Sequence, residues 1–192
     1  MTSVYFVRHA QPEYGWEDDR TRPLTSEGKR DTGMVLDFFK DKEIDAFYSS
    51  PYKRAFDTIA SAASFYGKEI FTDERLRERE AGIGGNTHPL FEKRWADHCF
   101  HEENGESILA VQERNIEALT EILAKNRDER IVIGTHGTAL SAILHFYQPS
   151  FGSEDFFRII DWMPYIIELD FDGDKLLAAK EHIYKEKEFQ RK

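Results

Sequence analysis

Short apolar runs alternate with longer amphipathic segments along most of this chain. Four runs have the β-branched and aromatic content of buried strands: residues 4–7, 44–48, 68–71 and 130–135. Segments with helical patterning follow these runs, at residues 25–42, 51–66, 108–126 and 137–147. Strands that alternate with helices predict an α/β fold: a three-layer α/β/α arrangement around a mostly parallel central sheet.

The remaining segments complete this predicted domain. Asp172-Gly173 is a hairpin turn signal, and the apolar runs that flank it, residues 165–171 and 175–179, predict antiparallel strands at a sheet edge. Residues 86–104 are irregular and rich in His and aromatic side chains, which indicates a cap or insertion over one end of the sheet. We expect the charged tail after Tyr184 to fray. No linker or repeat interrupts the pattern, so residues 1–192 are predicted to form a single domain.

Composition narrows the function classes. The net charge of -10 and the pI near 5.2 argue against a nucleic-acid partner and against an anionic membrane surface. The single cysteine, Cys99, excludes an intrachain disulfide and points to a reducing compartment. The N-terminus has no signal-peptide pattern, and no apolar stretch approaches the roughly 20 residues that span a bilayer. We therefore expect a cytoplasmic protein without a membrane partner.

Three predicted strands end in residues that suit phosphate chemistry. Arg8-His9 ends the first strand, His136-Gly137 ends the strand at 130–135, and Ser50 ends the second. Ser50 can cap the next helix with Pro51 at its first position, which places Arg54 in the first turn, where free N–H groups favour an anion. Parallel strands end at the same edge of a sheet, so these side chains should share one crevice. Arginine forks bind phosphoryl oxygens and an imidazole can attack phosphorus.

The same residues belong to a set of motifs that resembles the histidine phosphatase (phosphoglycerate mutase-like) superfamily. In order along the chain, the motifs are Val7-Arg8-His9-Ala10, Arg22-Pro23-Leu24-Thr25-Ser26-Glu27-Gly28, Ser49 to Ala55 with Thr58, Leu76-Arg77-Glu78, Gly105-Glu106-Ser107 and Thr135-His136-Gly137. Their order and rough spacing hold from residue 4 to about 145. Ala10 departs from the pattern, because the superfamily usually has Gly there.

The resemblance implies a two-step phosphoryl transfer. His9 would attack phosphorus to give a phosphohistidine, which water then hydrolyses. Arg8, Arg54 and His136 would hold the phosphoryl oxygens, and neighbouring cations would keep His9 neutral. Glu78 would protonate the leaving alkoxide and then activate water. This scheme requires no metal and no cofactor.

Other assignments rest on less sequence information. Gln11, Arg22 and Gly137 are candidate substrate contacts near the two histidine motifs. Glu78 has acidic neighbours that could be the proton donor in its place, namely Asp73, Glu74 and Glu80. His98 and His101 have a spacing compatible with zinc, but no further clear ligand accompanies them, so we expect no metal site.

These observations favour a phosphomonoester phosphatase acting on a small metabolite or a phosphoprotein. A phosphoglycerate mutase-type isomerase is the first alternative. Between Glu78 and Asn104, however, we find no arginine pair with a proline-rich segment of the kind that grips the substrate carboxylate in those mutases, which favours hydrolysis. A non-catalytic phospholigand-binding protein is the second alternative. The sequence sets neither the substrate nor the oligomeric state.

Overall fold

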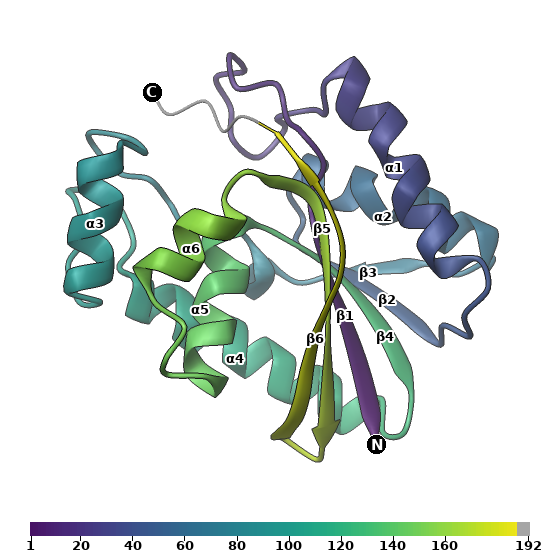
Figure 1. The fold of residues 1–192 in the computed structure, drawn as a ribbon. Coiled ribbons are helices and arrows are strands. Elements are labelled where there is room, and N and C mark those ends of the chain that lie inside the picture. Colours follow the sequence, from purple (N-terminus) through teal and green to yellow (C-terminus); the bar gives the residue numbers. More distant parts are fainter. Residues whose placement is uncertain (188–192) are drawn as a thin grey trace.

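The computed structural model describes residues 1–187, and a mixed sheet of six strands forms the centre of this part of the chain (Figure 1). The strands are β1 (Thr2–Arg8), β2 (Ala46–Ser49), β3 (Ile70–Thr72), β4 (Arg130–Thr135), β5 (Trp162–Asp172) and β6 (Lys175–Glu186). Their order is β3-β2-β4-β1-β5-β6. The pairs β3·β2, β2·β4 and β4·β1 are parallel, whereas β5 pairs antiparallel with β1 and β6. The predicted α/β fold with an antiparallel edge hairpin is confirmed.

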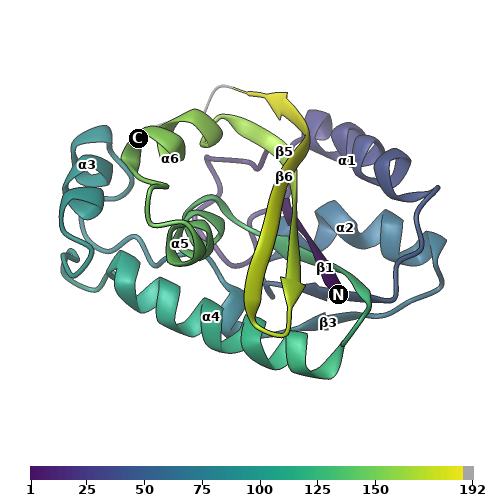
Figure 2. The same cartoon turned by 60° about the horizontal axis from the view of Figure 1, so that its bottom comes forward.

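Helices cover both faces of this sheet. They are α1 (Ser26–Phe39), α2 (Lys53–Phe65), α3 (His88–Ala96), α4 (Ile108–Lys125), α5 (Gly137–Tyr147) and α6 (Ser153–Ile159), with a 3-10 turn at Glu74–Leu76. Figure 2 shows α1 and α2 on one side of the strands and α4 and α5 on the other, with α3 beside α6 at one end. None of the helices in residues 1–187 combines the length and the apolar content needed to cross a lipid bilayer.

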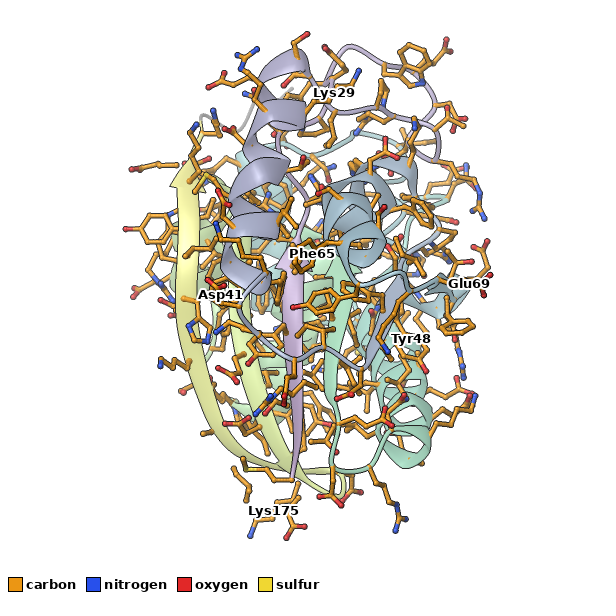
Figure 3. The ribbon with its side chains drawn as sticks, turned by 90° about the vertical axis from the view of Figure 1, so that its right-hand side faces the viewer. Lys29, Asp41, Tyr48, Phe65, Glu69 and Lys175 are labelled. Atoms are coloured by element: carbon orange, nitrogen blue, oxygen red, sulfur yellow. The ribbon has the colours of Figure 1, made fainter. Side chains whose placement is uncertain are left out.

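The sequence of β1 explains why helices are needed on both faces. Val4 and Phe6 point into the core that α4 and α5 cover, while Tyr5 and Val7 point into the core under α1 and α2. Successive strand residues face opposite sides of a sheet, and helices cover both sides of β1. All four side chains are therefore buried. In Figure 3, viewed from the side of α1 and α2, Lys29 on α1 and Lys175 on the hairpin lie at opposite ends of the molecule.

Several local predictions were wrong. Helix α2 begins at Lys53 with Tyr52 as its N-cap, so Ser50 and Pro51 precede the helix. The short helix α6 follows α5 and was not predicted. Strand β6 continues to Glu186, and the buried Lys187 pairs with Asp31, so the tail is ordered where fraying was expected. The rest of that predicted tail, residues 188–192, lies outside the described residues.

Candidate active site

The three strand ends identified in the sequence meet at one edge of the sheet. In the parallel register, Arg8 lies opposite Thr135 on β4, and Ser49 on β2 lies opposite Gly134. The N–H of His9 donates to Thr135 O at 3.1 Å, which ties the first histidine to the strand that precedes the second. The predicted convergence is therefore confirmed, and it follows from the order β2-β4-β1.

A cavity of about 530 Å³ opens at this edge, and most of the predicted site residues line it: Arg8, His9, Arg22, Arg54, Glu78 and Gly137. His136 is fully buried behind this lining, with its ring centroid 5.3 Å from that of His9. Gln11, like His136, is not part of this lining. Its amide oxygen accepts a hydrogen bond from the Thr25 hydroxyl at 3.2 Å, and its role as a substrate contact stays a prediction.

Hydrogen bonding fixes the tautomer of His9. Its Nδ1 lies 2.8 Å from the carbonyl oxygen of Ala10, which can only accept, so Nδ1 carries the proton. The lone pair therefore resides on Nε2, which accepts from Arg54 Nε at 3.3 Å. Burial, and then the charges of Arg54 and Arg8, hold the pKa of His9 well below its ordinary value. The ring thus stays neutral at physiological pH with a nucleophilic nitrogen in the cavity.

Arg8 is held in place by carbonyl groups of α6 and of β5, the strand that pairs with β1. Its Nη1 donates to Ile159 O at 2.5 Å and to Trp162 O at 3.0 Å, while its buried Nε has no partner in the described structure. A Cβ atom at Gly137 would lie 3.3 Å from that Nε. Glycine at the start of α5 therefore lets the guanidinium pack closely, with donor capacity left for an anion.

Arg54 projects from the first turn of α2, as predicted, and is paired with an acid from the loop after β1. Its Nη1 lies 2.6 Å from Asp19 O and 3.2 Å from Asp19 Oδ1, and Arg22 Nη1 lies 2.7 Å from the same carboxylate. Thr58 accepts the Ala10 N–H at 3.0 Å and donates to Arg54 O at 2.7 Å, which joins the end of β1 to α2. A phosphoryl group that binds Arg54 must compete with Asp19.

Ser50 sets the tautomer of His136. The serine Oγ accepts the N–H of Tyr52 at 3.1 Å and lies 2.8 Å from His136 Nε2. No other acceptor for the hydroxyl proton is found among the described residues, so Ser50 donates to Nε2 and the proton of His136 resides on Nδ1. That Nδ1 is buried without a partner in residues 1–187. Burial, followed by the charge of Arg54, lowers the pKa of His136 well below its ordinary value, so the ring is a neutral donor.

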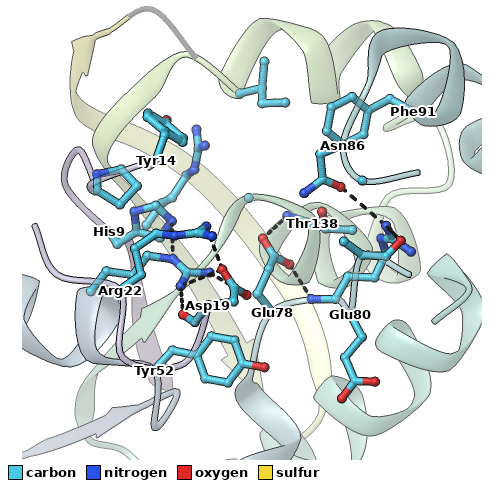
Figure 4. Close-up of a pocket in the computed structure, with 18 of the residues that line it drawn as sticks. His9, Tyr14, Asp19, Arg22, Tyr52, Glu78, Glu80, Asn86, Phe91 and Thr138 are labelled. Atoms are coloured by element: carbon cyan, nitrogen blue, oxygen red, sulfur yellow. Dashed lines mark hydrogen bonds and ion pairs between the residues drawn. The ribbon is translucent and has the colours of Figure 1, made fainter. Parts of the chain in front are cut away.

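Glu78 lies across the cavity from His9 and Arg22 and caps α5 (Figure 4). Its Oε1 accepts the N–H groups of Arg79 at 2.8 Å and Ala139 at 3.0 Å, and its Oε2 accepts the N–H of Thr138 at 3.0 Å. The carboxyl group is thereby fixed at the N-terminus of α5, the helix that follows His136.

The competing acids occupy other positions. Asp73 pairs with Arg75, and Glu74 pairs with Arg20, and neither acid lines the cavity. Glu80 does line the cavity, but its carboxylate lies 3.6 Å from Arg77 and has no contact with α5 comparable to that of Glu78. Glu78 is therefore the acid whose position best suits proton transfer across the cavity.

A sequence profile of the histidine phosphatase superfamily (branch 1) matches residues 4–176, which is most of the chain. The chain belongs to this superfamily. The resemblance drawn from the motifs is confirmed.

Relatives and solved structures agree with this membership of the histidine phosphatase superfamily. The chain is 26% identical to putative phosphoserine phosphatase 2 of Hydrogenobacter thermophilus, over 91% of this chain and 92% of that protein. It is 30% identical to phosphoglycerate mutase-like protein 4 of Arabidopsis thaliana, over 90% and 81% respectively. The fold is similar to that of Bacillus stearothermophilus YhfR, with a TM-score of 0.79, 23% identity and coverage of 92% and 95%.

The structure adds residues to this superfamily site that the sequence did not reveal. Asp19 lies in a polar loop without a motif, and its pairing with Arg54 depends on how that loop folds back. Tyr14 also lines the cavity, and burial raises the pKa of its hydroxyl to about 12.

His98 packs against Trp95 and His145. Within residues 1–187, no three His, Cys, Asp or Glu side chains gather closely enough to hold a metal ion.

Ser50 offers a test of the tautomer assignment. We expect Ser50→Ala to lower kcat/KM about tenfold, because His136 loses the bond that fixes its proton on Nδ1. The ¹⁵N chemical shifts of His136 should change from those of a pure Nδ1–H tautomer to those of a mixture. Ser49→Ala is the matched control, since the buried Ser49 hydroxyl has no partner in the described structure. Unchanged imidazole shifts in Ser50→Ala would contradict the assignment.

The neutral buried histidines predict how stability depends on pH. An unfolded histidine titrates near pH 6.5, whereas His9 and His136 titrate well below that value in the folded protein. Below about pH 6.5 the unfolded chain therefore binds protons that the folded chain does not, and the free energy of unfolding falls by up to about 1.4 kcal/mol per pH unit for each residue. Urea unfolding between about pH 5.5 and 7.5, in a buffer without phosphate, measures this slope. The slope should be smaller in His9→Asn, and an identical slope would refute the proposed titration.

Proposed function

We propose that this protein is a phosphomonoester phosphatase that forms a phosphohistidine on His9. The observation that carries the proposal is the position of His9 in the cavity lining, with its unprotonated Nε2 bonded to the Arg54 guanidinium. A neutral imidazole among fixed cations suits phosphoryl transfer to histidine, since the arginines stabilise charge on the transferred group. The profile match to the superfamily and relatives named as phosphatases support this enzyme class.

Two steps complete the reaction. In the first, His9 Nε2 forms a bond to phosphorus, the bond to the leaving oxygen breaks, and Glu78 gives that oxygen a proton. In the second, Glu78 takes a proton from water, the water oxygen bonds to phosphorus, and the N–P bond breaks. The electron pair returns to Nε2. Arg8, Arg54 and the Nδ1–H of His136 would bind the phosphoryl oxygens in both steps.

The size of the cavity supports a small phosphorylated metabolite as the proposed substrate. A volume of about 530 Å³ lies in the range of small-molecule sites. Two similar proteins point in the same direction. Putative phosphoserine phosphatase 2 is named for a small substrate, and a phosphoserine phosphatase of Entamoeba histolytica has been solved with 3-phosphoglyceric acid, with a TM-score of 0.78, 21% identity and 96% coverage of both chains.

The fate of the phosphoryl group tests the proposal. With p-nitrophenyl phosphate and a chelator present, we expect inorganic phosphate to form in equal amount to nitrophenolate. Incubation with 3-phosphoglycerate and a bisphosphorylated primer separates the mutase alternative, because a mutase would return the group to the substrate. Binding of phosphate without either product would instead support a non-catalytic phospholigand-binding protein and overturn the proposal.

A further inference from the structure

The segment that carries Glu78 is not held by regular secondary structure. Residues 77–80 follow the 3-10 turn that ends at Leu76 and precede the isolated β-bridge between Ala81 and Gly105, and they form neither helix nor strand. The Glu78 carboxyl nevertheless lies 3.0 Å from N–H groups in the first turn of α5. Contacts from outside the segment must therefore fix its backbone, and with it the carboxyl, in the cavity.

Arg114 on α4 binds three backbone carbonyls of this segment at once. Its Nη1 donates to Arg75 O and to Arg77 O, both at 2.7 Å, and its Nη2 donates to Glu78 O at 3.1 Å. Arg114 is not part of the cavity lining, so it acts on the segment and not on the substrate. A planar guanidinium presents its donors in a fixed fork that can serve three acceptors in this way, which the single nitrogen of a lysine cannot reproduce.

Glu106 completes this support. Its Oε1 accepts from Arg114 Nε at 2.9 Å, and its Oε2 accepts from Arg77 Nη1 at 2.5 Å and from the N–H of Glu80 at 3.0 Å. Burial alone would raise the pKa of Glu106, but the hydrogen bonds from Arg114 and Arg77 outweigh it and lower the pKa to about 2. The carboxylate is therefore charged at neutral pH. The sequence motif around Glu106 thus fixes both Arg114 and the backbone that follows Glu78.

Helix α4 connects this support to the phosphate-binding side of the cavity. Gln112, which precedes Arg114 by two residues on α4, donates through its amide nitrogen to Ala142 O of α5 at 3.0 Å. Figure 2 shows α4 beside α5 on the same side of the sheet, and α5 begins directly after His136. One helix therefore places the Glu78 segment and the N-terminus of α5 relative to each other.

We propose that Arg114 is a positioning residue for proton transfer. Its hydrogen bonds keep the Glu78 carboxyl within reach of the leaving oxygen and, in the second step, of the attacking water. A displacement of about 1 Å at a reacting group can slow a step by a factor on the order of 10². The inference rests on the proposed phosphatase function and on the proposed role of Glu78. Loss of Arg114 should slow the steps that need a proton donor or base and spare phosphoryl transfer from a leaving group that needs no proton.

Arg114→Lys tests this role with benzyl phosphate and p-nitrophenyl phosphate, two esters of similar size whose leaving groups differ in basicity. The variant keeps a positive charge beside Glu106 but lacks the fork that binds three carbonyls. We expect kcat/KM to fall about tenfold to 100-fold for benzyl phosphate and less than about threefold for p-nitrophenyl phosphate. A wild-type ratio of the two kcat/KM values would overturn the proposal, because a merely structural role lowers both values alike.

Arg75→Lys is the matched control. Arg75 also connects the segment to α4, through two hydrogen bonds of 2.9 Å to Glu121, but within residues 1–187 its side chain donates to no backbone carbonyl. Its replacement should leave the ratio of the two kcat/KM values within about twofold of the wild type. A shift as large as that in Arg114→Lys would show that any ion pair between the segment and α4 suffices, and would refute the assignment to Arg114.

Glu106→Gln is a second variant, which tests the proposal if Arg114→Lys does not fold. The neutral amide binds Arg114 less strongly than the carboxylate does, so benzyl phosphate should again lose more than p-nitrophenyl phosphate, by about threefold to tenfold in the ratio. Urea unfolding shows whether each variant is folded under the assay conditions. A folded Glu106→Gln enzyme with the wild-type ratio would contradict the proposal.

Glu78→Gln separates this inference from the proposed function. If Arg114 acts through the Glu78 carboxyl, adding Arg114→Lys to Glu78→Gln should lower both kcat/KM values by the same factor. A further change in their ratio in the double variant would refute the inference. If Glu78→Gln alone keeps the wild-type ratio, Glu78 is not the proton donor, and the inference fails while the phosphatase function stands. If the wild type releases phosphate from neither ester, the phosphatase function itself fails.

Discussion

His9→Asn is expected to lower phosphatase kcat by a factor on the order of 10⁴ or more, because it removes the nucleophile and leaves only the binding groups. The asparagine amide can still donate to the Ala10 carbonyl that now accepts from His9 Nδ1 at 2.8 Å. The local hydrogen bonding is therefore largely preserved. Steady-state hydrolysis of p-nitrophenyl phosphate measures the loss, and alkaline quenching of the wild type during turnover should trap an acid-labile, alkali-stable phosphoenzyme that the variant lacks.

His145→Asn is a matched control for this experiment. His145 Nδ1 lies 2.8 Å from the carbonyl oxygen of Phe151, the same arrangement as in His9, but the residue does not line the cavity. Its replacement should change kcat less than about twofold. A His9→Asn enzyme that retains turnover, or a phosphoenzyme that persists in it, would show that another residue is the nucleophile.

The sequence predicted the part of the site that depends on strand order. Val4 to Val7 alternate between two buried faces, and only a strand covered by helices on both sides accommodates that pattern. Once β1 and β4 are parallel neighbours, Arg8-His9 and His136 must lie at the same edge. These positions follow from backbone geometry and require no knowledge of the loops.

Features that depend on competition between side chains were not predictable in the same way. Ser50 has the residue type and position of a helix N-cap, but its hydroxyl accepts from Tyr52 and bonds to His136, 86 residues further along the chain. Similarly, a charged side chain such as Arg79 is normally exposed. Its burial follows from the distant Glu102, and the orientation of Asn86 follows from that burial in turn.

Two roles of Glu78 must be separated: proton transfer in the cavity and capping of the N-terminus of α5. It accepts the N–H groups of Thr138 and Ala139, and it lines the cavity. We expect Glu78→Gln to lower kcat/KM for an alkyl phosphate by about 10²-fold to 10⁴-fold, since a poor leaving group needs the proton. For p-nitrophenyl phosphate the loss in kcat/KM should be less than about tenfold, because nitrophenolate leaves without protonation.

Two further measurements decide the role of Glu78. With p-nitrophenyl phosphate, Glu78→Gln should release a burst of nitrophenolate close to the enzyme concentration and then turn over slowly, because the phosphohistidine forms but water lacks its base. A purely structural role as the α5 cap would instead lower kcat/KM for both substrates by the same factor and give no burst. Glu80→Gln is the matched control for a neighbouring acid of the lining. If Glu80→Gln, and not Glu78→Gln, shows the dependence on leaving group, the proton donor is Glu80.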